Sequence, residues 1–255
     1  MARLSVPSLL DLSGRVALVT GAGGGIGAAI SRRLADAGAA VVAHHRGGGG
    51  EQVAGSIKAD GGRAAAVAAD LTEAGGPQTV IDAAVTAFGG LDVLVGCAAA
   101  QPVTPLSEIT SEELAAVLDT NLSAAFGLLQ AAEPVLSDGG AVVHLASIEA
   151  WHALPGHAHY AASKAGLVRL TAAAAAELGP RLRVNAVAPG LTWREGLPEQ
   201  WPDGVARWET AAPLGRLVDP DEVADAVLFL ASPASRGITG TVLTVDGGMT
   251  AVSPW

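Results

Sequence analysis

Seven short runs rich in Ala, Val and Leu recur along the 255-residue chain, separated by longer segments of helical period. The runs are apolar along their whole length, as is typical of parallel strands covered on both faces. Strands and helices that alternate in this way form a doubly wound parallel sheet. We therefore predict an α/β fold of the Rossmann type, in which helices flank a seven-stranded parallel sheet within a single domain, 1–255. The expected strands are 15–20, 39–44, 64–69, 91–96, 141–146, 183–188 and 241–246, and the expected helices lie near 25–37, 51–60, 77–88, 111–133, 160–178 and 219–231.

One long segment departs from this alternation. Residues 190–216 lie between the sixth expected strand and a helix that begins with the sequence DPDE, where Asp219 can cap and Glu222 can complete a capping box. The segment holds three of the five tryptophans. Long irregular excursions in compact domains are usually functional, so we predict a substrate loop or lid at about 190–216.

Charge and composition exclude several kinds of partner. The net charge is −10 and no run of Lys or Arg occurs, whereas nucleic-acid binders concentrate positive charge on one face. The lone cysteine, Cys97, fits a reducing compartment. No signal-peptide cleavage pattern is evident, and no apolar run reaches the roughly 20 residues that span a bilayer. We expect a cytoplasmic protein with no membrane or nucleic-acid partner.

A glycine-rich loop follows the first expected strand. The sequence VTGAGGGIGAAI, residues 19–30, comes directly off that strand and opens a helix. Gly21, Gly25 and Gly27 leave room for the turn, for backbone approach to a pyrophosphate, and for close packing of helix on strand. The helix N-terminus then faces the phosphates. The loop predicts a dinucleotide-binding site.

The end of the second strand favours NADP(H) over NAD(H). It reads HHRGG, with His45 and Arg46 but no carboxylate before Glu51. A carboxylate would accept a hydrogen bond from the ribose 2′-hydroxyl of NAD, whereas an Arg can hold the 2′-phosphate of NADP through paired hydrogen bonds. Asp70, at the end of the third strand, could accept from the adenine amino group or simply cap its own turn.

Three residues in one short stretch predict a proton relay. Tyr160 and Lys164 are four apart at the start of a helix and so share a face. Ser147 closes the fifth strand, at the edge where parallel sheets bind ligands. A nearby ammonium favours the phenolate and so lowers the tyrosine pKa, which is ordinarily about 10. A serine hydroxyl can hold a carbonyl oxygen, so the three suit carbonyl reduction.

Other chemistries fit this stretch less well. His152, His157 and His159 could in principle bind zinc, but the segment offers no i, i+4 pair of histidines, so we predict no metal. A serine hydrolase would have the elbow G-x-S-x-G, and HLASIEA lacks both glycines. We expect the histidines at the rim or wall of a pocket.

Five motifs occur in order: TGAGGGIG at 20–27, NLSAAF with Asn121, Ser147 followed by Tyr160-Ala-Ala-Ser-Lys164, RVNAVAPG, and TVDGG. Together they resemble the short-chain dehydrogenase/reductase family of the classical type over about 14–248. The resemblance implies an NADP-dependent oxidoreductase that moves a hydride between nicotinamide and the carbonyl or alcohol of a small molecule. It also implies a homotetramer or homodimer in which helices 111–133 and 160–178 pair between subunits.

The resemblance assigns roles to individual residues. It implies that Tyr160 is the general acid/base, that Lys164 binds the nicotinamide ribose and lowers the tyrosine pKa, and that Ser147 orients the substrate carbonyl. Asn121 would hold a water that links Lys164 to solvent. The cofactor contacts that it implies are Gly21, Gly25, Ile26, Gly27, His45, Arg46, Asp70, Leu71, Ala98, Tyr160, Lys164, Pro189, Gly190 and Thr192.

The chain departs from the family pattern at three places. Gly96-Cys97-Ala98-Ala99 stands where the family commonly has Asn-Asn-Ala-Gly, so side-chain hydrogen bonds that support the sheet are expected to be missing. Gly24 replaces a basic residue of many NADP-preferring members. Arg194 stands where the family often has a Thr for the nicotinamide amide.

The substrate is left open. Trp151 and Trp193, with the other loop tryptophans, could line a pocket for a planar or bulky apolar ketone, or could pack the lid or a subunit contact. Glu149 is expected to face the pocket and select a polar or cationic group. Alternatives are a pteridine reductase-like activity, a 3-oxoacyl-carrier-protein reductase-like activity, which would need a basic patch, and a non-catalytic nucleotide sensor.

Overall fold

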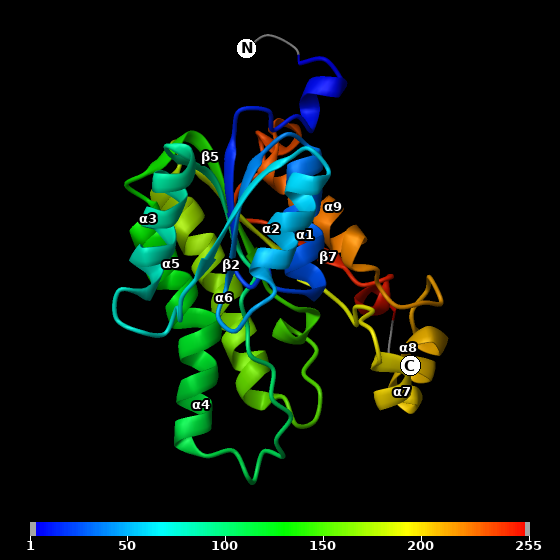
Figure 1. Cartoon of the computed structure of the whole chain (residues 1–255). Coiled ribbons are helices and arrows are strands. Elements are labelled where there is room, and N and C mark those ends of the chain that lie inside the picture. The colour runs from blue at the N-terminus through cyan, green and yellow to red at the C-terminus, as the bar shows by residue number, and fades with distance from the viewer. Residues whose placement is uncertain (1–3, 253–255) are drawn as a thin grey trace.

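A seven-stranded parallel sheet runs through the middle of the molecule in the order β3-β2-β1-β4-β5-β6-β7 (Figure 1). The computed structural model describes residues 4–252. The chain winds outward from β1 in one direction and from β4 in the other, so the crevice that binds ligands in such sheets lies at their carboxyl ends. The predicted fold class is confirmed. The strands are β1 Val16–Val19, β2 Ala40–His45, β3 Arg63–Ala68, β4 Leu91–Gly96, β5 Leu136–Leu145, β6 Arg183–Pro189 and β7 Val242–Val245.

Helices cover both faces of the sheet, which explains why the strands are apolar throughout. In β1, Ala17 and Val19 pack into the cluster under α1, α2 and α9, whereas Val16 and Leu18 pack into the cluster under α3, α5 and α6. All four side chains are buried. The helices are α1 Gly25–Asp36, α2 Gly50–Ala59, α3 Gly76–Phe88, α4 Ser111–Leu118, α5 Ala124–Ala132, α6 Ala158–Leu178, α7 Leu197–Gln200, α8 Pro202–Ala211 and α9 Pro220–Ala231.

The helix expected over 111–133 is continuous but not uniform. A π-helical segment, Asp119–Ser123, joins α4 to α5 and carries the buried Asn121. Among the described residues, this combined helix is the one that is long and apolar enough to cross a membrane. Core helices of soluble proteins reach the same length and hydropathy. Only 28% of its most apolar window is buried within the chain, so much of its apolar surface faces outward.

The segment expected to be an irregular lid is partly helical. Residues 190–216 contain α7 and α8, which lie together beside the sheet at the lower right of Figure 1. Leu197, Val205 and Leu217 form a small apolar cluster of their own, and Trp208 packs against it. Pro198 and Pro202 stand in the first turns of these two helices, where proline is tolerated.

The start of α9 has the predicted capping box. The Asp219 side chain accepts from the backbone N–H of Asp221, and the Glu222 carboxylate accepts from the backbone N–H of Asp219. Glu222 also binds the Arg216 guanidinium at 2.6 and 2.8 Å. These contacts fix the point where the lid segment returns to the body.

Candidate active site

The glycine loop packs backbone against backbone at the carboxyl end of β1. A Cβ at Gly21 would stand 2.9 Å from the Cα of Ala98, and a Cβ at Gly27 would stand 2.2 Å from the carbonyl oxygen of Gly21. Neither position has room for a side chain. Thr20 Oγ1 accepts from the backbone N–H groups of Cys97 and Ala98, at 3.0 and 3.2 Å, and so ties β1 to the segment after β4.

This loop fits a dinucleotide. The first turn of α1, which includes Ile26, begins at the loop and presents backbone N–H groups that no carbonyl of its own helix can reach. Such a helix terminus attracts the negative charge of a pyrophosphate. The absence of side chains at Gly21 and Gly27 allows a ligand to approach the backbone closely, so the residues present suit the cofactor class that the sequence predicts.

The residues at the ends of β2 and β3 have partners within the protein. His45 is buried; its Nε2 lies 2.9 Å from a Glu51 oxygen and its Nδ1 accepts from the Gly48 N–H. It thereby shapes the loop that leads into α2. The Arg46 side chain is 71% exposed, with its guanidinium 3.9 Å from a carboxylate oxygen of Asp70. Arg46 is therefore open to a ligand from the solvent side.

Asp70 caps its own turn. One carboxylate oxygen accepts from the backbone N–H and the hydroxyl of Thr72, at 2.9 and 2.7 Å, and these hydrogen bonds hold the pKa of Asp70 below its usual range. The other oxygen faces Arg46. The neighbouring Leu71 is buried and belongs to the core cluster beneath α3.

Ser147, Tyr160 and Lys164 come together at the carboxyl end of β5 and the first turns of α6. Tyr160 is 8% exposed, and burial raises the pKa of its phenol to about 12. The Ser147 hydroxyl opposes this rise in pKa by hydrogen bonding, and the Glu149 carboxylate adds to it. The phenol is thus protonated at neutral pH. The sequence predicts instead that Lys164 lowers the pKa of the phenol.

Lys164 lies beneath the tyrosine ring. Its Nζ donates to the backbone carbonyl of Leu145 at 2.7 Å and lies 5.6 Å from the centroid of the Tyr160 ring. Burial lowers the pKa of Lys164 to about 8, so the ammonium form still predominates at neutral pH. This positive charge is available to a negative charge that develops on Tyr160.

Asn121 organises the floor of the site. Its amide donates to the carbonyl of Ala100 and to the Ser163 hydroxyl, both at 2.9 Å, and its carbonyl oxygen accepts from the Ala100 N–H at 2.7 Å. Both N–H donors of the side chain are thus engaged. The side chain thereby anchors the segment after β4 to α6.

Three polar side chains form a wall next to Tyr160. Glu149 is 7% exposed, and its two carboxylate oxygens lie 2.8 Å from His157 Nδ1 and 3.1 Å from Gln101 Nε2. The His157 and Tyr160 rings meet edge to face at 6.1 Å. The Glu149 N–H donates to the Ser147 hydroxyl at 3.1 Å. This Glu149–His157–Gln101 wall therefore joins the catalytic candidates directly.

The lid begins at the carboxyl end of β6. Gly190 follows Pro189. A Cβ at Gly190 would stand 2.5 Å from the Trp208 ring, so Trp208 of the lid packs where a side chain at position 190 would lie. Thr192 donates to the Gly190 carbonyl and forms a bridge with Val218. Trp151 and Trp193 are 51% and 50% exposed, so about half of each side chain is open to solvent.

A buried histidine packs beside Gly96, one of the residues that depart from the family pattern. His144 on β5 pairs in register with Gly96 on β4, and its ring would stand 3.2 Å from a Cβ at Gly96. Thr171 Oγ1 donates to the carbonyl of Leu167, so it accepts from His144 Nδ1–H at 2.9 Å. The ring takes up space beside Gly96, and burial lowers the pKa of His144 to about 4.

The histidines expected at the rim or wall of a pocket occupy different places. His157 belongs to the polar wall, His152 is exposed, and His144 and His159 are each 1% exposed. Within residues 4–252, no group of three or more His, Cys, Asp or Glu side chains could hold a metal ion.

The sequence did not reveal two further residues of the site, Gln101 and Ser163, because both meet their partners only through the tertiary fold.

Known proteins match the chain along nearly its whole length. A family model described as enoyl-(acyl carrier protein) reductase matches residues 21–250. D-threitol dehydrogenase of Mycolicibacterium smegmatis is 39% identical over 253 residues, which cover 97% of this chain and 97% of that protein. The 3-oxoacyl-[acyl-carrier-protein] reductase of Thermotoga maritima is 37% identical over 252 residues, which cover 94% of this chain and 99% of that protein.

A solved structure agrees with these matches. The crystal structure of the angucycline C-6 ketoreductase LanV with bound NADP has a TM-score of 0.90 and 34% sequence identity. The match covers 95% of this chain and 98% of that one.

The burial of His144 predicts a specific acid sensitivity. In the unfolded chain, His144 binds a proton near its ordinary pKa of 6.5. In the folded chain, burial lowers the pKa of His144 to about 4. The contribution of neutral His144 to stability is therefore present above pH 6.5 and lost as pH falls toward 4, by up to about 3 kcal/mol. His144→Asn should lose less stability than the wild type over this interval, as measured by urea denaturation at several pH values.

His152→Asn is the matched control, because His152 is exposed. Its stability should follow the wild-type pH curve. Parallel curves for the wild type and His144→Asn would contradict the assignment of the buried neutral ring.

Proposed function

The chain belongs to the short-chain dehydrogenase/reductase family and is an oxidoreductase, and we propose that it transfers a hydride between NADP(H) and the carbonyl or alcohol carbon of a small molecule. The observation that carries this proposal is the convergence of Ser147, Tyr160 and Lys164 beside the glycine loop. NAD(H) is the alternative cofactor. A non-catalytic nucleotide sensor is the alternative from another class, and turnover separates the two.

In this proposal, Tyr160 moves the proton. When bound, the nicotinamide supplies or accepts the hydride. Tyr160, protonated at neutral pH, donates its phenolic proton to the substrate oxygen during reduction, while the Ser147 hydroxyl holds that oxygen. The buried Lys164 ammonium stabilises the phenolate that develops, and the reverse proton movement accompanies oxidation.

The support for NADP(H) comes from the end of β2. Arg46 is the basic side chain there, and its exposure leaves the guanidinium accessible to a phosphate. No carboxylate stands on β2 where one would accept from the ribose 2′-hydroxyl of NAD. LanV, which has NADP bound in its crystal structure, is similar over nearly the whole chain.

The polar wall supports a substrate that carries hydroxyl or cationic groups besides the reacting carbon. A buried carboxylate such as Glu149 stabilises hydrogen-bond donors and disfavours apolar groups. We therefore assign Glu149 to the substrate pocket, with Trp151 and Trp193 covering it from the solvent side. A polyol is consistent with this wall, and D-threitol dehydrogenase is among the relatives.

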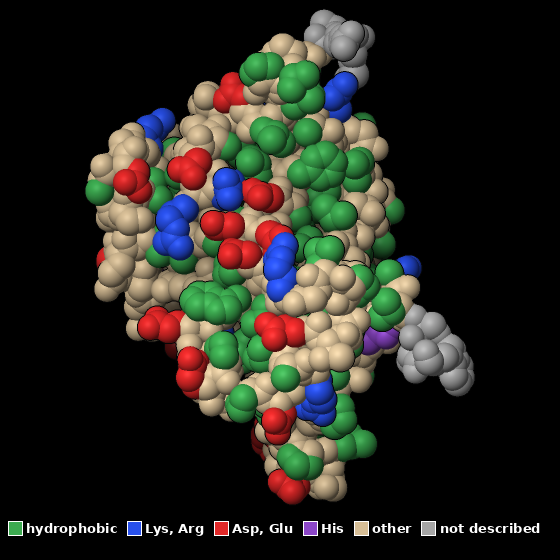
Figure 2. Space-filling view, turned by 90° about the vertical axis from the view of Figure 1, so that its right-hand side faces the viewer, with side chains coloured by type: hydrophobic (Ala, Val, Ile, Leu, Met, Phe, Trp, Pro, Cys, Tyr) green, Lys and Arg blue, Asp and Glu red, His purple; other side chains and the backbone are tan. Residues whose placement is uncertain are grey.

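A carrier-protein substrate fits the surface less well. An acidic carrier needs a basic patch, whereas Figure 2 shows Lys and Arg side chains scattered singly among Asp and Glu on the face it presents. The net charge of −10 agrees with this view. The relationship to 3-oxoacyl-[acyl-carrier-protein] reductases therefore supports the reaction class more than the substrate.

We also propose that the protein is a cytoplasmic homotetramer or homodimer, with no membrane or nucleic-acid partner. The outward apolar surface of the Ser111–Ala132 helix supports pairing between subunits, with α6 beside it. Leu114 and Phe126 are 39% and 46% exposed on this helix. Covering such side chains in an oligomer would remove apolar area from water.

Tyr160→Phe tests the proton relay. Removing the phenolic hydroxyl should lower kcat/KM for ketone reduction by about a thousandfold, the scale of general acid catalysis. NADPH affinity should stay within about twofold, because the ring remains to pack against the cofactor site. The two measurements are NADPH oxidation over a panel of hydroxyketones, cyclic ketones, quinones and pterins, and NADPH fluorescence titration.

Two outcomes would contradict the proposal. An unchanged reduction rate would remove Tyr160 from its role. Tight NADPH binding by the wild type, with no turnover on any member of the panel, would favour the sensor.

Arg46→Ala tests the cofactor. Loss of the guanidinium should weaken NADPH binding by about tenfold or more while NADH affinity changes little, because only NADPH carries the 2′-phosphate. Direct titration with each nucleotide measures both affinities. An equal loss for the two nucleotides would be inconsistent with a 2′-phosphate contact.

Glu149→Gln tests the polar wall with the shape of the side chain preserved. Substrates with hydroxyl groups next to the carbonyl should lose about tenfold in kcat/KM, because the charge-assisted hydrogen bond is weakened. Unsubstituted cyclic ketones should be affected less. A uniform loss across both classes would indicate that Glu149 acts through Ser147 and Tyr160 rather than on the substrate.

A further inference from the structure

A buried histidine that the proposed mechanism leaves unused stands directly before Tyr160. His159 lies in the first turn of α6, too deep in the protein to form a pocket rim. It also belongs to no group that could hold a metal ion among residues 4–252. Its ring contacts the backbone of Tyr160 on one side and α4 on the other, so these two contacts define what it can do.

The first contact satisfies a backbone group at the start of α6. The first N–H groups of a helix have no carbonyl partner within that helix. His157, at the N-cap position, makes no side-chain cap, and its Nδ1 instead lies 2.8 Å from Glu149. The Nδ1 of His159 accepts from the backbone N–H of Tyr160 at 3.0 Å. This contact is buried, so its loss would leave a backbone donor unpaired away from water.

This hydrogen bond fixes the tautomer of the His159 ring. A ring nitrogen that accepts carries no proton, so the ring proton is on Nε2. Nε2 is buried and has no hydrogen-bond partner within residues 4–252, but Oε1 of Glu113 lies 3.5 Å from it. At this distance the carboxylate attracts the Nε2–H group and favours the tautomer in which Nδ1 is free to accept.

The Glu113 carboxylate departs from the usual cap to reach this place. Thr110 accepts from the Glu113 N–H at 3.1 Å, which is the first half of a capping box at the start of α4. At the start of α9, the corresponding carboxylate completes the box. In α4 the carboxylate instead lies against His159 and accepts from the Thr104 hydroxyl at 2.6 Å.

Thr104 connects the same contacts to the substrate side of the site. Its backbone N–H donates to the carbonyl of Gly156 at 2.9 Å, just before α6. Three residues earlier in the chain, Gln101 belongs to the polar wall. α4 packs beside α6 in Figure 1, which keeps these segments together. Glu113 therefore links the segment 101–104 to the residue that precedes Tyr160.

We propose that His159 is a positioning residue for Tyr160: its Nδ1 holds the backbone N–H of the tyrosine, and Glu113 holds the ring in the tautomer that can accept. The inference rests on the proposed hydride transfer, in which Tyr160 moves the proton. The phenolic oxygen is at the far end of a long side chain, so a small rotation of the backbone moves it by a larger distance. A displacement of about 1 Å can lower a rate about a hundredfold, because the proton must pass to the substrate oxygen along a short path.

Two substitutions separate the roles of the two ring nitrogens. The Oδ1 of Asn is as many bonds from Cα as Nδ1 of His, so His159→Asn can still accept from Tyr160, whereas the amide of Gln corresponds to Nε2. The measurements are kcat and KM for NADPH-dependent reduction of the best ketone in the panel. His159→Gln should lower kcat about tenfold or more with KM within about twofold, because the contact acts in the transition state. His159→Asn should stay within about threefold of the wild type for both constants.

The Tyr160→Phe background separates positioning from a general loss of structure. Without the phenolic hydroxyl there is no proton donor to position, so adding His159→Gln should change the residual rate by less than about twofold. A further loss of about tenfold in that background would mean that His159 supports the packing of the site at large, and would overturn the proposal.

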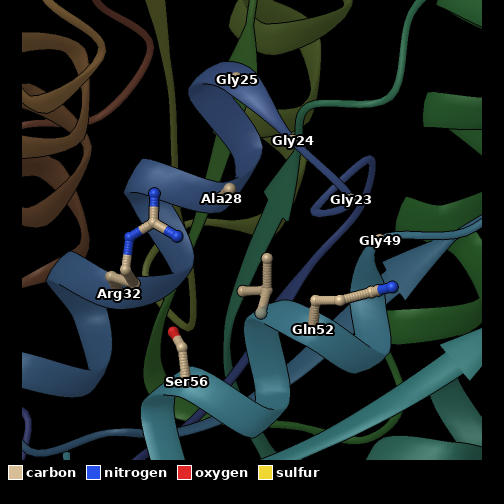
Figure 3. A pocket seen from close by; sticks show the side chains of 9 residues that line it. Gly23, Gly24, Gly25, Ala28, Arg32, Gly49, Gln52 and Ser56 are labelled. Atoms are coloured by element: carbon tan, nitrogen blue, oxygen red, sulfur yellow. The ribbon is translucent and has the colours of Figure 1, made fainter.

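NADPH affinity is the control for folding. The glycine loop opens α1, which packs with α2 on the face of the sheet opposite α6. Figure 3 shows Gly23, Gly24 and Gly25 beside α2 in that region, and neither His159 nor Glu113 lines it. Each variant should therefore bind NADPH within about twofold of the wild type in a fluorescence titration.

Glu113→Gln tests the second part of the proposal. The variant keeps an acceptor for Thr104 but removes the charge that faces Nε2, so kcat should fall about threefold or more while KM stays unchanged. Glu112→Gln is the matched control, because Glu112 is an exposed carboxylate in the same first turn of α4, and it should match the wild type. An equal loss in the two variants would indicate an effect of charge at the helix N-terminus and would overturn the role of Glu113.

The outcomes distinguish this inference from the proposed function. If the wild type reduces no ketone, hydride transfer fails and the inference fails with it. If the wild type is active and loses that activity in Tyr160→Phe, while His159→Gln keeps the wild-type kcat, only the inference is overturned. Equal losses in His159→Asn and His159→Gln would also overturn it, because the acceptor at Nδ1 would then make no difference.

Discussion

Backbone packed against backbone at the carboxyl edge of β1 and β4 is the constraint on which the site depends. Gly21 lies against Ala98, and Gly27 lies against Gly21, at distances that leave no room for side chains. Thr20 adds two hydrogen bonds across the same junction. The nucleotide cradle and the floor of the catalytic site are thus parts of one rigid unit. That rigidity is what a hydride transfer needs, because the reacting atoms must be held in contact.

At one departure from the family pattern, a neighbouring strand supplies the side chain that packs there. Gly96 carries no side chain, and the His144 ring from the next strand stands beside it, tied to α6 through Thr171. Gly96 and His144 thus pack as a small and a large residue on two neighbouring strands. The His144 ring thus occupies the space beside the last residue of β4.

The sequence was informative where the signal is local and uninformative where it is tertiary. Strands, helix starts and the stretch from Ser147 to Lys164 follow from periodicity, capping and spacing, and the structure brings these residues together as expected. The polar wall did not follow, because Gln101, Glu149 and His157 come from three separate segments. The raised pKa of Tyr160 also depends on burial, which no motif reports. Two lid helices were missed because their prolines resemble loop residues until the helix starts are known.

The π-helical turn at Asp119–Ser123 sets the rotational phase between two halves of one long helix. Such a turn holds one residue more than an α-helical turn. Deleting a single residue here and restoring ordinary winding would leave the buried side of α5 facing the core, because the wider turn absorbs one residue. The same deletion would displace Asn121 from Ala100 and Ser163. The extra residue of this turn therefore serves the floor of the site rather than the packing of α5.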